Sequence, residues 1–160
     1  MGVLVQSNHG GILRINGFPV GKELRTHVKK NPLEENLEGS CMVIVATDAP
    51  LDSRNLKRLA KRALLGIARS GGYYSNGSGD YAIAFSTAKE VRIPYKSKGH
   101  TISLEILKNN YMSPLFLAAA EATEEAILNS MFKANSMTGN NDHHVNALPL
   151  KMIKILMKGL

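Results

Sequence analysis

The feature that most constrains this chain is an apolar run, residues 41–46, that directly follows a polar, acidic segment. Gly39 and Ser40 form the junction between the two. Such a run after a glycine turn predicts a buried β-strand that begins with a serine. Ser40 is then either an ordinary strand-edge hydroxyl or the nucleophile of a self-cleaving precursor. In the second case its hydroxyl attacks the preceding carbonyl, and glycine leaves the approach open.

Further strands and turns are predicted on both sides of this junction. Residues 2–7 and 12–15 fit a hairpin around the turn Asn8-His9-Gly10-Gly11. Residues 22–38 are polar and charged and predict a surface loop. Residues 81–86 predict a further strand, whereas residues 101–107 fit either a strand or a helix.

Helical spacing of apolar residues predicts two long helices and a short one. Asp52 or Ser53 can cap the first, which ends before Gly71-Gly72. The second begins at Ser113-Pro114, with serine as the cap and proline at the first helical position. Residues 135–146 predict a loop, and Pro149 opens a short amphipathic terminal helix. Strands mixed with long helices indicate α/β layers.

Composition bounds the class of protein. At 160 residues the chain fits one domain with a real core, and its 44% hydrophobic content is that of a soluble globular protein. The formal net charge of +7 suggests nucleic-acid binding as one hypothesis. The positive residues are, however, dispersed and have no aromatic residues interleaved with them, so a solvated basic surface is favoured. The single cysteine, Cys41, excludes an internal disulfide framework and a multi-cysteine metal site. No stretch has the length of a membrane span or the layout of a signal peptide, so we expect a cytoplasmic protein without a membrane partner.

Two further groups give Ser40 a chemical context. The glycine-rich loop of residues 75–80 can fold tightly enough to present Ser78 and Asp80 to one space, although the same residues are ordinary turn composition. Asn8, at a strand end, can donate to an oxyanion or can be a routine turn residue.

Other polar and aromatic residues carry weaker signals. His143 and His144 follow Asp142, but adjacent histidines point apart and no third well-spaced ligand is present, so a solvent loop is favoured over a metal site. Tyr73 and Tyr74 either line a substrate pocket or simply pack.

Taken together, these segments resemble the L-aminopeptidase/D-amidase-esterase family, which includes the β-peptidyl aminopeptidases. The resemblance runs through nearly the whole chain, and it is carried by residues 2–8, 39–51, 75–81, 121–129 and 147–150. It implies an αββα, Ntn-hydrolase-like sandwich that activates itself by cutting at Gly39-Ser40. Residues 1–39 would then end the larger subunit, and residues 40–160 would form the smaller one.

The resemblance also implies the roles of the site residues. Ser40 would be the nucleophile, Ser78 would hydrogen-bond its amine or hydroxyl, and Asp80, where some relatives have glutamate, would hold that network. Asn8 would contribute to the oxyanion hole. The implied activity is a D-aminopeptidase-like hydrolase that releases N-terminal residues from small peptides, amides or esters, with no metal or other cofactor.

One departure bears on activity. Family chains carry a large additional N-terminal region, and this sequence aligns with their C-terminal portion. We therefore expect the missing N-terminal half as a partner, together with a homo-oligomer. The alternative is a catalytically silent remnant or subunit that keeps the fold elements but does not turn over alone. Nucleic-acid binding is a third hypothesis, favoured by net charge alone.

Overall fold

The computed structural model describes residues 1–24, 39–96 and 99–158. Its centre is a three-stranded sheet in the order β1 (Gly2–Asn8), β2 (Ser40–Thr47), β3 (Tyr81–Ser86). β1 runs antiparallel to β2, and β3 runs parallel to it. The expected strand after Ser40 therefore exists and lies in the middle of this sheet.

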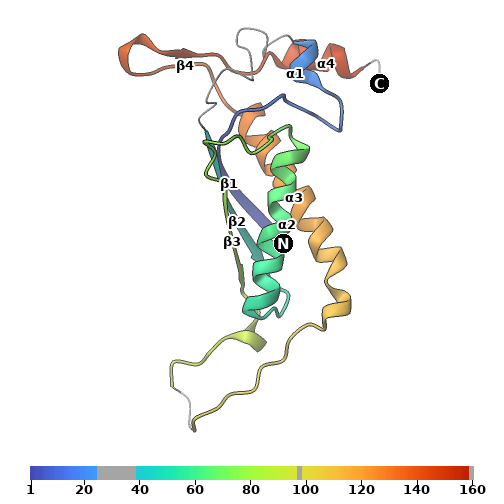
Figure 1. Ribbon diagram of the computed structural model, residues 1–160, viewed down its shortest axis with the longest axis vertical. Coiled ribbons are helices and arrows are strands. Elements are labelled where there is room, and N and C mark those ends of the chain that lie inside the picture. The colour runs from blue at the N-terminus through green and yellow to red at the C-terminus, as the bar shows by residue number, and fades with distance from the viewer. Residues whose placement is uncertain (25–38, 97–98, 159–160) are drawn as a thin grey trace.

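The helices α2 (Ser53–Arg69) and α3 (Ser113–Phe132) lie side by side on one face of the sheet (Figure 1). Asp52 caps α2 by accepting from the Asn55 amide at 2.8 Å, as its sequence predicts. The predicted cap of α3 is wrong: Met112 is the N-cap, Ser113 is already helical, and no side chain caps this end. Pro114 lies in the first turn as expected, where a missing amide proton costs nothing.

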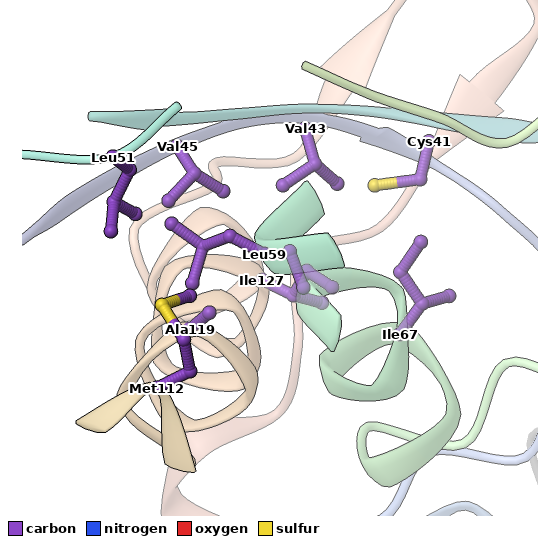
Figure 2. Packing of buried hydrophobic residues seen from close by; sticks show 10 residues of the cluster. Cys41, Val43, Val45, Leu51, Leu59, Ile67, Met112, Ala119 and Ile127 are labelled. Atoms are coloured by element: carbon purple, nitrogen blue, oxygen red, sulfur yellow. The ribbon is translucent and has the colours of Figure 1, made fainter. Parts of the chain in front are cut away.

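Alternate residues of β2 point into the core. Cys41, Val43 and Val45 face the helices and are buried against side chains of α2 and α3 (Figure 2). Met42 and Ile44 point the other way and are each 40% exposed. The run is thus buried on one face only among the described residues, because helices cover a single side of the sheet.

The predicted hairpin of residues 2–7 and 12–15 is wrong. β1 pairs with β2, and residues 12–14 bond instead to the chain that follows α2: the Ile12 amide donates to the Gly71 carbonyl, and the Arg14 amide to that of Ser70. Of the predicted polar loop, residues 22–24 belong to the end of the short helix α1 (Val20–Glu23), and residues 25–38 lie outside the described part.

The remaining elements are short. Residues 101–107 form neither a helix nor a strand, and the 3₁₀ turns η1 (Lys89–Val91) and η2 (Asn109–Tyr111) flank this connection. The predicted loop of residues 135–146 contains a small hairpin of β4 (Met137–Thr138) and β5 (His144–Val145) around η3 (Asn140–Asp142). The expected terminal helix is α4 (Leu150–Met157).

Candidate active site

The sheet topology brings the predicted site residues to one edge. β1 ends at Asn8, which is the register partner of Ser40, the first residue of β2. Because β3 runs parallel to β2, the loop that precedes β3 lies beside the start of β2. That loop carries Ser78 and Asp80, so three segments distant in sequence meet around Ser40.

The candidate nucleophile is held by a backbone donor. The Gly79 amide donates a hydrogen bond to Ser40 Oγ at 3.0 Å. A Cβ on Gly79 would lie 3.4 Å from the same oxygen, so the loop backbone approaches Ser40 closely. An amide proton aimed at this oxygen stabilises the negative charge that builds on it when the hydroxyl is deprotonated.

Asp80 links the strand to the loop. Its Oδ1 accepts from the Cys41 amide at 2.8 Å, and its Oδ2 accepts from the Ser78 hydroxyl at 2.5 Å. The Ser78 amide closes the turn by donating to the Ser75 carbonyl at 2.8 Å. Because the Ser78 hydroxyl donates to the carboxylate, the lone pairs of Ser78 Oγ remain able to accept a hydrogen bond from a neighbour.

Gly39 lies against the end of β1. Its φ is 157°, and a Cβ there would lie 2.6 Å from the Asn8 carbonyl oxygen and 3.0 Å from the His9 Cα. The opposing atoms belong to backbone, so a larger residue could fit only if the strand end moved. Glycine before Ser40 is therefore required by packing, and it also leaves the Gly39 carbonyl open to attack.

Titratable side chains that were not singled out as site residues lie near Asp80. Burial lowers the pKa of His9 from 6.5, and the charge of Asp80 partly opposes this shift. Burial first and Asp80 second raise the pKa of Cys41 to about 11. Burial, then Asp80 and Cys41, raise the pKa of Tyr74 to about 12. These thiol and phenol groups are thus uncharged at neutral pH.

The structure places Ser78 and Asp80 in one loop beside Ser40. The Ser40 hydroxyl accepts from the Gly79 amide and the Ser78 hydroxyl donates to Asp80, so the hydrogen bond between Ser78 and Ser40 that the resemblance implies stays a prediction. Asn8 is the register partner of Ser40, and it is exposed at the same edge of the sheet. The Gly79 amide was missed because it carries no side-chain signal beyond the glycine-rich loop. Tyr74 donates its hydroxyl to the Leu64 carbonyl of α2, so it tethers this loop to the helix.

The histidine pair lies elsewhere. His144 contacts Thr138 and Asn146 in the β4–β5 hairpin, and both histidines are exposed, as predicted for a solvent loop. Within the described residues no group of three histidine, cysteine or acidic side chains is placed to hold a metal ion. None of the helices in that same part of the chain is long and apolar enough to cross a bilayer.

Comparison with known proteins identifies the family. The sequence profile of peptidase family S58 matches residues 1–145. This chain belongs to peptidase family S58. A relative, the β-peptidyl aminopeptidase BapA of Sphingosinicella microcystinivorans, is 40% identical over 99% of this chain.

Two solved structures are similar to this chain in both sequence and fold. The PH0078 protein of Pyrococcus horikoshii OT3 superposes with a TM-score of 0.84 at 46% identity over 98% of the chain. The L-aminopeptidase D-Ala-esterase/amidase of Ochrobactrum anthropi superposes with a TM-score of 0.82 at 35% identity, also over 98%. The latter is described as a prototype of the serine aminopeptidases and a variant of the Ntn-hydrolase fold. This chain therefore has part of that fold.

The chain spans less than half the length of these relatives. It covers 43% of BapA and 42% of each of the two solved chains. In the described residues, the three-stranded sheet and the helices α2 and α3 form one β layer and one α layer of the expected αββα sandwich, and β4 and β5 form a separate two-stranded sheet.

Proposed function

We propose that this chain is the nucleophile-bearing part of a serine aminopeptidase that activates itself by cleavage at Gly39-Ser40. The observation that carries the proposal is the bonded set at the start of β2. Ser40 Oγ accepts from the Gly79 amide, and the neighbouring Ser78 hydroxyl is oriented by Asp80. Membership of S58, and the serine aminopeptidase among the solved relatives, support the same chemistry.

Self-cleavage would begin with attack of Ser40 Oγ on the Gly39 carbonyl carbon. Ser78 Oγ is the proposed acceptor of the Ser40 proton, and in the same step it passes its own proton along its hydrogen bond to the Asp80 carboxylate. Reversal of this relay supplies the proton that the leaving amine takes up. The Gly39–Ser40 C–N bond breaks as the amine takes up a proton, which leaves an ester between Gly39 and Ser40 Oγ. Water hydrolyses that ester and gives a Gly39 carboxylate and a free Ser40 amine.

The new amine supplies the base for turnover. An α-amino group has a reference pKa of about 7.7–8.0, so near neutral pH it can take the proton from its own hydroxyl. Ser40 Oγ would then attack a substrate carbonyl, and Asn8 would donate to the oxyanion, a contribution of about 2.7–4 kcal/mol per donor. Release of the amine and hydrolysis of the acyl ester complete the cycle. Small peptides, amides and esters with a free N-terminal residue are the proposed substrates.

The bare face of the sheet supports a partner for this activity. Large apolar side chains on that face are exposed: Leu4, Met42, Ile44, Tyr81, Ile83 and Phe85. Asn8 and Ser40 belong to the end of the same sheet. We propose that polypeptide corresponding to the rest of the relatives' length covers this face and completes the substrate site. Homo-oligomer formation remains a prediction.

The proposal is tested by intact mass and by turnover. We expect the chain, co-expressed with the portion of the Pyrococcus horikoshii relative that lies outside the match, to split into residues 1–39 and 40–160 and to hydrolyse an amino-acid anilide. Ser40→Ala should abolish both, whereas Ser103→Ala, an exposed hydroxyl outside the site, should change neither. An unsplit chain of 17.4 kDa without turnover would instead support the silent remnant.

A further inference from the structure

Four titratable side chains lie around the start of β2, and the proposed chemistry uses only one of them. Cys41 points into the core from β2, His9 follows β1, and Tyr74 and Asp80 belong to the loop between α2 and β3. Asp80 reaches the strand itself through the Cys41 amide. His9 and Asp80 therefore flank the Gly39-Ser40-Cys41 segment from the two neighbouring strands.

The imidazole of His9 is closely surrounded. Its Cδ2 lies 3.0 Å from where a Cβ on Gly72 would be, so the ring fills a space that only glycine leaves open. Its backbone packs against Gly39. Its Nδ1 is buried and has no hydrogen-bond partner among the described residues. A buried imidazole nitrogen without a partner favours the uncharged ring, because a proton added there needs an acceptor.

Asp80 is the charged group that acts on this ring. Its negative charge opposes the effect of burial on the pKa of His9. Burial first and this charge second raise the pKa of both Cys41 and Tyr74. Neither the thiol nor the phenol carries charge near neutral pH. Of the groups that face His9 from β2 and from the loop before β3, only Asp80 can therefore balance an imidazolium.

We propose that His9 is a pH-sensitive positioning residue for Asp80. This proposal rests on the proposed function of the Ser40 site. The uncharged ring leaves the carboxylate on the Cys41 amide and the Ser78 hydroxyl. The protonated ring, with donors on both nitrogens, draws the carboxylate away from them. Ser78 then loses the acceptor that orients its proton, and transfer of the Ser40 proton to Ser78 becomes slower.

The link between His9 and Asp80 can be tested without any activity. In an NMR pH titration of the labelled chain, the His9 imidazole should have its midpoint below 6.5, and Asp80→Asn should lower that midpoint further. The Cys41 amide proton should shift with the His9 midpoint, and in His9→Gln that step should vanish. A Cys41 amide that ignores the His9 step, or a His9 midpoint unchanged by Asp80→Asn, overturns the proposal.

The consequence for chemistry is tested by the rate of self-cleavage in the co-expressed protein, trapped before processing. The precursor has no Ser40 amine, so its acid limb cannot come from that group. We expect the rate to fall about tenfold per pH unit below the His9 midpoint. His9→Gln, or His9→Phe if glutamine prevents folding, should move that limb to lower pH, and the exposed control His144→Gln should leave it in place. If cleavage occurs and neither His9 variant moves the acid limb, the proposal for His9 is overturned. If no cleavage occurs, the result counts against the Ser40 assignment, and the NMR titration decides the proposal for His9.

Discussion

Asp80 divides its carboxylate between two neighbours that belong to different parts of the chain. One oxygen accepts from the backbone of β2, and the other accepts from Ser78 in its own loop. A single side chain thus fixes the loop relative to the strand that begins at the candidate nucleophile. The same charge disfavours ionisation of the thiol and the phenol around it. We therefore expect Cys41 and Tyr74 to stay protonated near neutral pH beside the candidate nucleophile.

Cys41 should be inert despite lying next to Ser40. With a pKa of about 11, roughly one thiol in a thousand is ionised at pH 8, and the side chain is fully buried. We expect iodoacetamide to label the folded chain at pH 8 far more slowly than the urea-unfolded chain, as followed by intact mass. Labelling at equal rates in both states would contradict this environment.

The stability of the chain should depend on pH through His9. Its folded pKa is lowered below the unfolded value of 6.5, so the unfolded state binds the proton more readily. The free energy of unfolding is then unaffected by His9 above pH 6.5 and falls as the pH drops from 6.5 through the lowered folded value. Urea unfolding at pH 7.5 and pH 5.5 should show a smaller loss in His9→Gln than in the unmodified chain. Equal losses in the two proteins would argue against a half-buried, uncharged His9.

The helical layer depends on one close crossing. At Gly66 of α2, a Cβ would lie 2.6 Å from the Glu124 amide nitrogen of α3 and 2.7 Å from the Ala120 carbonyl oxygen. Near this point Arg69 pairs with Glu124 at 2.7 Å. Backbone meets backbone here, so neither helix can yield by a change of rotamer. The separation of α2 and α3, and hence how both cover the sheet, is set at this residue.

Gly66→Ala should consequently destabilise the chain, although alanine is the better helix former by about 1 kcal/mol. Overpacking at the crossing should lower the free energy of unfolding by about 1–3 kcal/mol. Gly2→Ala is the control, because nothing lies within 4 Å of its Cβ position. Chemical denaturation of both variants measures the difference, and a stabilised Gly66→Ala would show that the helices are free to separate.

Local signals predicted the elements well, and non-local pairing was where prediction failed. The Asp52 cap and the strands of residues 40–47 and 81–86 follow from short-range chemistry. The hairpin failed because β1 pairs with β2 across more than thirty residues, which no turn signal encodes. Ser78 and Asp80 were predictable from the loop and the family resemblance. The surroundings of His9 were not, because they depend on the approach of Gly72 after α2.

The whole molecule has one covered face and one uncovered face. Val43 and Val45 are buried beneath the helices, whereas Ile83 on the opposite face of the sheet is 59% exposed. A contiguous apolar surface of this kind marks an interaction site. Because the described residues place no element over it, its side chains contribute little to the stability of this chain by itself.

Ile83→Lys should therefore separate stability from assembly. In the isolated chain we expect the free energy of unfolding to change by no more than about 0.5 kcal/mol. Co-purification with the remaining portion of the Pyrococcus horikoshii relative should be lost, because a charge would be buried in the contact. Leu59→Ala, in the covered core, should instead lower the free energy of unfolding by about 2–5 kcal/mol. It should leave co-purification of the folded chain with its partner intact. Retention of the partner by Ile83→Lys would place the interface elsewhere.

The ladder between β1 and β2 has a consequence for what a backbone cut at Gly39-Ser40 would look like. Every residue of β1 from Gly2 to Asn8 has a register partner in β2, and the two strands belong to opposite sides of the cut. The two products would stay paired through the β1–β2 hydrogen bonds as a non-covalent heterodimer. Electrophoresis would separate them only after denaturation. The new amino terminus would be the first residue of the middle strand, with a neighbouring strand on each side. It would therefore be held in one position, unlike the flexible chain ends that proteolysis of a loop leaves.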